Sequence, residues 1–101
     1  MYVVERKSPR FPFFASAQLI ETRTDARLLA RTSDISREGC YLDMLNPLPT
    51  GTRLKINVTH QNKQLDAVGL VVHSELNVGM GVRFEEIGQR SVIDAWLAEL
   101  A

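Results

Sequence analysis

The chain lacks several features that would assign it to a large class of proteins. Its 101 residues include a single cysteine, Cys40, so no internal disulfide can form, and this fits a reducing cytosol. No apolar run approaches the length that spans a membrane, and charged residues follow the first four residues at once, which a signal peptide would not allow. We therefore expect a cytoplasmic protein with no membrane insertion.

A strong overall charge is also missing. The formal net charge is zero, so nothing draws the whole chain towards nucleic acid or a membrane surface. The charges are nevertheless unevenly spread, because residues 1–37 hold seven basic and four acidic side chains, a balance of +3, and the remainder has a balance of −3. The positive N-terminal part favours a small anionic ligand at that end.

Groups typical of catalytic or metal sites are sparse. The two histidines, His60 and His73, stand in no spacing typical of metal ligands or of a catalytic pair. Cys40 begins a predicted strand, where a buried structural thiol is favoured over a nucleophile, and Glu85 and Glu86 indicate a solvated strand end. We expect no enzymatic activity, no catalytic residue, no metal ion and no cofactor.

The sequence contains instead a succession of short strand-like runs. The clearest covers residues 53–59, where Leu54, Ile56 and Val58 alternate with polar residues, the pattern of a half-buried strand. Similar runs separated by turn residues cover residues 13–22, 26–33, 40–44, 63–74 and 79–85. In the run 63–74, the larger aliphatic side chains that share one face are those of Val68, Leu70 and Val72.

The period of the apolar residues changes near the end of the chain. One face of a helix at residues 88–100 would carry Val92, Ile93, Trp96, Leu97 and Leu100. Six short strands followed by one amphipathic helix predict an all-β dominated fold, a six-stranded antiparallel β-barrel with a C-terminal helix covering one opening.

Two short motifs stand in the positive part of the chain. The first, Arg6-Lys7-Ser8-Pro9-Arg10, is an Arg-x-x-x-Arg sequence in an arm, residues 1–12, whose prolines exclude a regular helix. The second, Asp34-Ile35-Ser36-Arg37-Glu38-Gly39, is an Asp-x-Ser-x-x-Gly turn between two predicted strands. Together with the Gly-x-Gly-Val-x-Phe strand at residues 79–84, they resemble the PilZ domain, the bacterial receptor module for cyclic di-GMP.

The resemblance implies a ligand, cyclic di-GMP, and a set of residues that bind it. In the family, the two arginines bind guanine edges or phosphates with their forked donors, and the intervening lysine adds charge. The aspartate accepts bonds from guanine N–H groups, beside the serine hydroxyl, and the glycine permits a tight turn or a close approach to the backbone. In this chain these residues are Arg6, Lys7, Arg10, Asp34, Ser36 and Gly39.

The spacing of the second motif makes a geometric prediction of its own. Asp34 and Ser36 lie two residues apart, so an extended backbone would point both side chains to the same side.

We therefore predict a non-catalytic receptor in which a flexible arm, residues 1–12, closes on a barrel domain, residues 13–101, when cyclic di-GMP binds. A downstream protein would then read the new surface. Two alternatives stay open: a PilZ-fold adaptor that has lost ligand binding and acts by protein contact, and a small barrel that binds single-stranded nucleic acid. Zero net charge argues against the latter, so we expect neither DNA nor RNA as a partner.

Overall fold

The computed structural model describes residues 9–101, and in this range seven strands precede one helix. The strands are β1 Phe11–Pro12, β2 Ser16–Glu21, β3 Arg27–Ile35, β4 Gly39–Asp43, β5 Arg53–His60, β6 Lys63–Glu75 and β7 Gly79–Ile87. The helix, α1, spans Arg90–Leu100.

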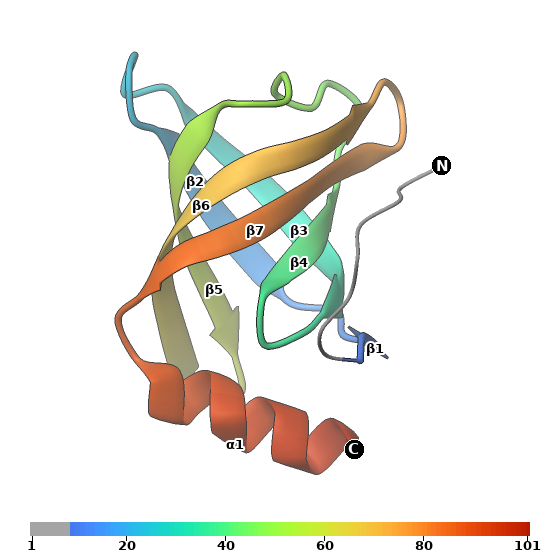
Figure 1. Cartoon of the computed structure of the whole chain (residues 1–101), viewed down its shortest axis with the longest axis vertical. Coiled ribbons are helices and arrows are strands. Elements are labelled where there is room, and N and C mark those ends of the chain that lie inside the picture. Colours follow the sequence, from blue (N-terminus) through green and yellow to red (C-terminus); the bar gives the residue numbers. More distant parts are fainter. Residues whose placement is uncertain (1–8) are drawn as a thin grey trace.

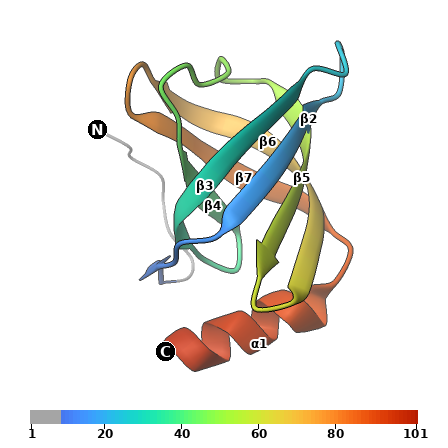
Figure 2. The same cartoon turned by 180° about the vertical axis from the view of Figure 1, so that it is seen from behind.

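Strands β2 to β7 close into a six-stranded antiparallel barrel. Neighbouring strands follow the order β3-β2-β5-β6-β7-β4, and β4 pairs again with β3. Closure satisfies the backbone groups that an open sheet would leave at its edges. Figure 1 and Figure 2 show the tilted strands from two sides, with α1 lying across one end of the barrel. The predicted barrel with a C-terminal helix is confirmed.

The barrel interior takes one face of each strand. In β5, Leu54, Ile56 and Val58 are at most 2% exposed, as their alternation predicts. In β6 the inward face carries Leu65, Ala67 and Val71, and the apolar face singled out from the sequence is the half-buried outer one.

The inner face of β6 is buried although some of its side chains are small, because the interior there is narrow. A Cβ at Gly69 would lie 2.4 Å from Val82 Cγ1, so this part of the interior has no room for a larger residue. Apolar residues occur on both faces of β6, so the pattern alone does not say which face is buried.

Helix α1 begins two residues later than the sequence predicts. The backbone N–H of Gly88 donates to the Asp66 carbonyl at 2.7 Å, and the Gln89 side chain accepts from the Asp66 N–H at 2.7 Å, so both residues are held against β6. From Arg90 onward the helix packs Ile93 and Trp96, which are 0% and 2% exposed, into the barrel opening. In the described part of the chain, no helix is long and apolar enough to cross a membrane.

A β-bulge in β3 decides which way Asp34 points. Thr32 pairs with Leu42 and Asp34 pairs with Tyr41, so Ser33 is an extra residue between them. Thr32 is fully buried, and regular alternation would turn Asp34 inward as well. The extra residue reverses the alternation and brings the carboxylate to the outer surface of the barrel.

The end of the arm belongs to the sheet. Phe11 pairs with Ile35 and Pro12 pairs with Asp34, which forms the short strand β1 beside β3. The sequence placed these two residues in the arm because it contains two prolines, but a proline is tolerated where its missing N–H leaves no ladder bond unmade. The pairing holds the chain just after Arg10 next to Asp34.

Thr32 of β3 binds the backbone of residues 13–15, which follow β1. We therefore expect Thr32→Val to destabilise the fold. Its Oγ1 accepts from the Ala15 N–H at 2.9 Å and donates to the Phe13 carbonyl at 2.6 Å in a fully buried position. Valine keeps the volume but leaves two backbone groups unsatisfied, a loss of roughly 1–3 kcal/mol in the free energy of unfolding. Urea unfolding measures it, with exposed Thr59→Val as the control; equal losses from both variants would contradict the assigned role.

Candidate functional site

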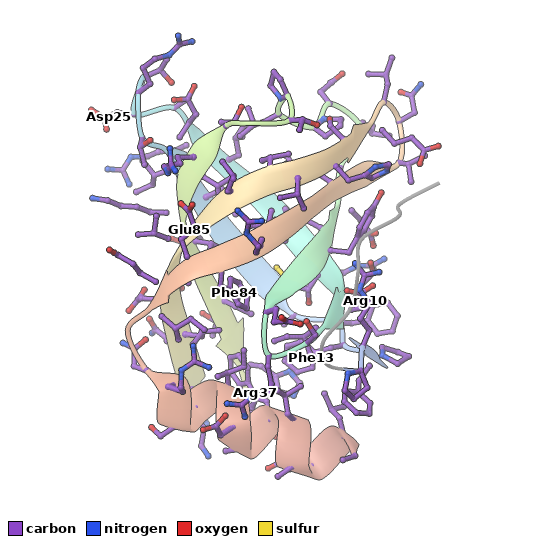
Figure 3. The ribbon with its side chains drawn as sticks, viewed as in Figure 1. Arg10, Phe13, Asp25, Arg37, Phe84 and Glu85 are labelled. Carbon is purple, nitrogen blue, oxygen red and sulfur yellow. The ribbon has the colours of Figure 1, made fainter. Side chains whose placement is uncertain are left out.

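The two sequence motifs meet at Arg10 and Asp34. Arg10 Nη1 lies 3.7 Å from Asp34 Oδ2, and the two side chains are 15% and 25% exposed. Strand β1 and the bulge in β3 produce this contact, since one fixes the chain after Arg10 and the other turns Asp34 outward. In Figure 3, Arg10 lies at the side of the barrel near β4. A partly desolvated guanidinium beside a carboxylate offers both donors and acceptors to a polar ligand.

Ser36 is held inside its own turn. Its N–H donates to the Gly39 carbonyl at 2.8 Å, its hydroxyl reaches the same carbonyl at 3.4 Å, and the hydroxyl accepts from the Glu38 N–H at 3.2 Å. Strand β3 ends at Ile35, so the extended-strand argument that grouped Ser36 with Asp34 does not apply to it. Ser36, 7% exposed, closes the turn, and its contact with the ligand remains a prediction.

Gly39 is required by a close approach between strands. A Cβ at this position would lie 2.0 Å from the Val82 carbonyl oxygen and 3.2 Å from Arg83 Cα, both backbone atoms of β7. Its φ is not positive, so a tight turn does not require the glycine. The sequence suggested a tight turn or a close approach by a ligand, and the approach seen here is that of β7. Ligand contact at Gly39 remains a prediction.

Two predicted ligand residues, Arg6 and Lys7, lie outside the described residues, and their roles remain predictions. The second motif also makes a contact with the helix that sequence reasoning missed. Arg37 Nη1 lies 2.9 Å from Asp94 Oδ1 of α1, so the turn is joined to the helix, as Figure 3 shows for the position of Arg37. No local pattern could reveal a partner so distant in the sequence.

A second contact connects the arm end to the helix. The Phe13 ring lies 5.2 Å from the Trp96 ring and 4.7 Å from the His60 ring, centroid to centroid. Phe13 is 4% exposed, so its ring packs in the core against the helix. Three residues after Arg10, the chain therefore contacts Trp96 of α1.

Cys40 lies beneath the site as a buried thiol, as predicted. Burial, with a smaller contribution from the Asp34 carboxylate, raises the pKa of the Cys40 thiol to about 12, and the Arg10 guanidinium acts in the opposite direction. Because the thiolate is the nucleophilic form, Cys40 is inert at neutral pH.

A groove elsewhere on the surface is a second place where a ligand could be held. This groove, of about 530 Å³, runs along β2, β5 and β6, is lined in part by Ile20, Ile56, Val68 and Ile87, and contains none of the motif residues. Its lining is mainly apolar, which suits a neutral ligand better than a dianion. We place the candidate site at Arg10 and Asp34 because the charge complementary to a phosphate or a guanine is found there.

Solved structures share the architecture. The crystal structure of the PilZ domain of CeSA from a cellulose-synthesizing bacterium aligns with a TM-score of 0.64 and 18% identity, covering 75% of this chain and 80% of that one. The Bacillus subtilis inhibitor of motility, MotI/DgrA, aligns with a TM-score of 0.70 and 14% identity, covering 93% of this chain and 49% of that one. The chain thus spans about half of the Bacillus protein. At these identities the similarity shows the fold.

A search of the curated proteins finds no match. The family model of the PilZ domain, however, matches residues 5–99 and includes both motifs. The chain therefore belongs to the PilZ domain family, a family of non-catalytic receptors and adaptors for cyclic di-GMP signalling.

Proposed function

We propose that the protein is a non-catalytic receptor that binds cyclic di-GMP at Arg10 and Asp34 and passes a change of shape to a partner protein. The observation that carries the proposal is the contact between these two residues, one from each motif, at 3.7 Å on the outer surface of the barrel. Family membership supports the choice of ligand, and this contact supports the proposed location.

The chemistry of the pair suits guanine and phosphate. A guanidinium donates two parallel bonds to guanine O6 and N7 or to two phosphate oxygens, and the Asp34 carboxylate accepts from the N1–H and N2–H donors. At 3.7 Å the pair is longer than a strong ion pair, so ligand atoms can replace part of this contact. Both side chains are partly shielded from water, which strengthens such bonds.

The contacts around the site favour a change of conformation on ligand binding over a catalysed reaction. Cys40 is buried as a thiol, and we assign no reacting group among the described residues. The ion pair between Arg37 and Asp94 and the packing of Phe13 on Trp96 both join the site to α1. We infer that α1 is the element whose position or surface changes on binding. The single cysteine of the protein, Cys40, is a buried thiol, which suits action in the reducing cytoplasm.

Calorimetry with cyclic di-GMP, linear pGpG and GTP tests the proposal directly. Cyclic di-GMP should bind to one class of site, and the other two nucleotides should bind far more weakly. At a ligand concentration a hundredfold above the dissociation constant, binding should stabilise the fold by about 2.7 kcal/mol. For a domain of this size this is a rise in Tm on the order of 10 °C or more.

The same titration separates the alternatives. No heat and no change in Tm at saturating cyclic di-GMP would remove the receptor function and leave the adaptor. Tight binding of a single-stranded oligonucleotide that weakens steeply with salt would instead favour the nucleic-acid alternative.

A further inference from the structure

A row of residues continues from Asp34 across the outer surface of the barrel. Asp34 pairs with Tyr41 of β4, Tyr41 pairs with Gly81 of β7, and Gly81 pairs with His73 of β6. Directly opposite residues of an antiparallel ladder project from the same face. Asp34, Tyr41 and His73 therefore share one face, although neither aromatic residue belongs to a motif.

Bulges place both ends of this row. In β6, Val71 and His73 have consecutive partners in β7, so Val72 is an extra residue. Val71 is fully buried, and regular alternation would send His73 inward with it. The bulge at Val72 turns His73 outward, as the bulge at Ser33 does for Asp34. Bulges often redirect side chains beside functional sites, and here two of them serve the same row.

The two rings approach each other across Gly81 of β7. Their strands are separated by β7, about 10 Å in all. The Tyr41 and His73 ring centroids nevertheless lie 6.5 Å apart with the planes inclined by 38°. Gly81 between them has no side chain, and a Cβ at Gly79 would lie 2.7 Å from Tyr41 Cε1, so glycines make room for the tyrosine ring. The result is an aromatic ledge, Tyr41 and His73, beside the Arg10–Asp34 pair.

The two ends of the row differ in charge. Arg10 lies at one end, whereas at the other Glu75 Oε2 lies 3.8 Å from His73 Nε2. A carboxylate repels a phosphate but accepts bonds from guanine N–H groups. The Arg10–Asp34 end therefore offers both a cation and an acceptor, whereas the Glu75 carboxylate makes the His73 end suit a base better than a phosphate.

We propose that Tyr41 and His73 form a stacking subsite for one guanine of cyclic di-GMP, next to the Arg10–Asp34 pair. The subsite rests on the proposed function, because it needs that ligand to occupy the row. A base stacks on the ring of an aromatic side chain, so the affinity should depend on the ring and little on the tyrosine hydroxyl.

Tyrosine variants test the subsite by calorimetry. Tyr41→Leu keeps apolar volume without the ring and should weaken cyclic di-GMP binding about tenfold or more, the usual effect of removing one base–aromatic stack. Tyr41→Phe keeps the ring and should bind within about twofold of the unmodified protein. The control is Phe14→Leu, because Phe14 is 60% exposed and lies outside the row. This variant should bind as the unmodified protein does.

The outcomes distinguish the subsite from the function on which it rests. If the unmodified protein binds and Tyr41→Leu binds equally well, the subsite is wrong and the receptor function stands. If Tyr41→Phe loses as much as Tyr41→Leu, the hydroxyl is responsible and stacking is overturned. If the unmodified protein does not bind at all, both proposals fall.

A measurement on the unmodified protein covers the case in which Tyr41→Leu does not fold. The ring protons of His73 should move upfield in NMR spectra as cyclic di-GMP is added, because a stacked guanine shields them. Unmoved His73 signals at saturation would overturn the subsite.

Discussion

Replacing Arg10 with alanine should weaken cyclic di-GMP binding by about a hundredfold, since a bidentate arginine–guanine contact is worth roughly 1–3 kcal/mol and a second effect adds to it. The second effect comes from Asp34, which is only 25% exposed and would face the ligand without the cation 3.7 Å away. A partly buried carboxylate that has lost this cation repels the phosphates more strongly. Calorimetry gives the loss, and circular dichroism should show an intact barrel.

Two variants show whether the arginine fork or mere charge is responsible. Arg53→Ala removes the same charge from another surface ion pair, since Arg53 donates to Glu85 at 2.8 and 3.2 Å, and it should leave binding nearly unchanged. Arg10→Lys keeps the charge without the fork and should lose most of the affinity. If lysine restored full binding, or if Arg53→Ala weakened it equally, the site would be a nonspecific cationic patch, and raised salt would abolish binding.

The elements with a regular period could be predicted from the sequence. Strand β5 alternates without interruption, and its three apolar residues are buried as expected. The apolar face predicted for the helix includes Ile93 and Trp96, and both are buried. In each case one face is apolar and the other polar, so burial of the apolar face decides the structure.

The exact geometry of the site could not be predicted in this way. Thr32, Ser33 and Asp34 are all polar, so no hydrophobic pattern marks the residue at which the alternation shifts. The bulge arises from pairing with β4, which is a property of the ladder rather than of the segment. The bulge at Val72 in β6 and the ion pair of Arg37 with Asp94 also depend on partners distant in the sequence, so the local sequence does not predict them.

The second motif combines residues with different physical roles. Asp34 faces the candidate ligand site, whereas Ser36 closes the turn that follows it. Gly39 lets β4 lie against β7. A sequence motif cannot distinguish residues that contact a ligand from residues that shape the backbone around it. The distinction needs the hydrogen bonds and contacts of the folded chain.

Gly39→Ala should therefore destabilise the whole fold. The new methyl group would lie 2.0 Å from the Val82 carbonyl oxygen, and because that atom belongs to the backbone of β7, no side-chain rotation can relieve the clash. Separating β4 from β7 should lower the free energy of unfolding by about 3 kcal/mol or more, the upper part of the range for overpacking. The corresponding fall in Tm is roughly 10–20 °C.

Gly88→Ala is the matched control, because its nearest contact, the Asp66 carbonyl oxygen, would lie 3.3 Å from the new Cβ. This variant should lose about 1 kcal/mol or less. Thermal unfolding of both variants without ligand measures the difference, and a Gly39→Ala Tm close to that of Gly88→Ala would show that β4 can shift freely. Because Gly39→Ala acts on the barrel closure, a loss of cyclic di-GMP binding in this variant would follow from lost structure. Arg10 and Tyr41 are accordingly the positions at which binding can be tested with the barrel intact.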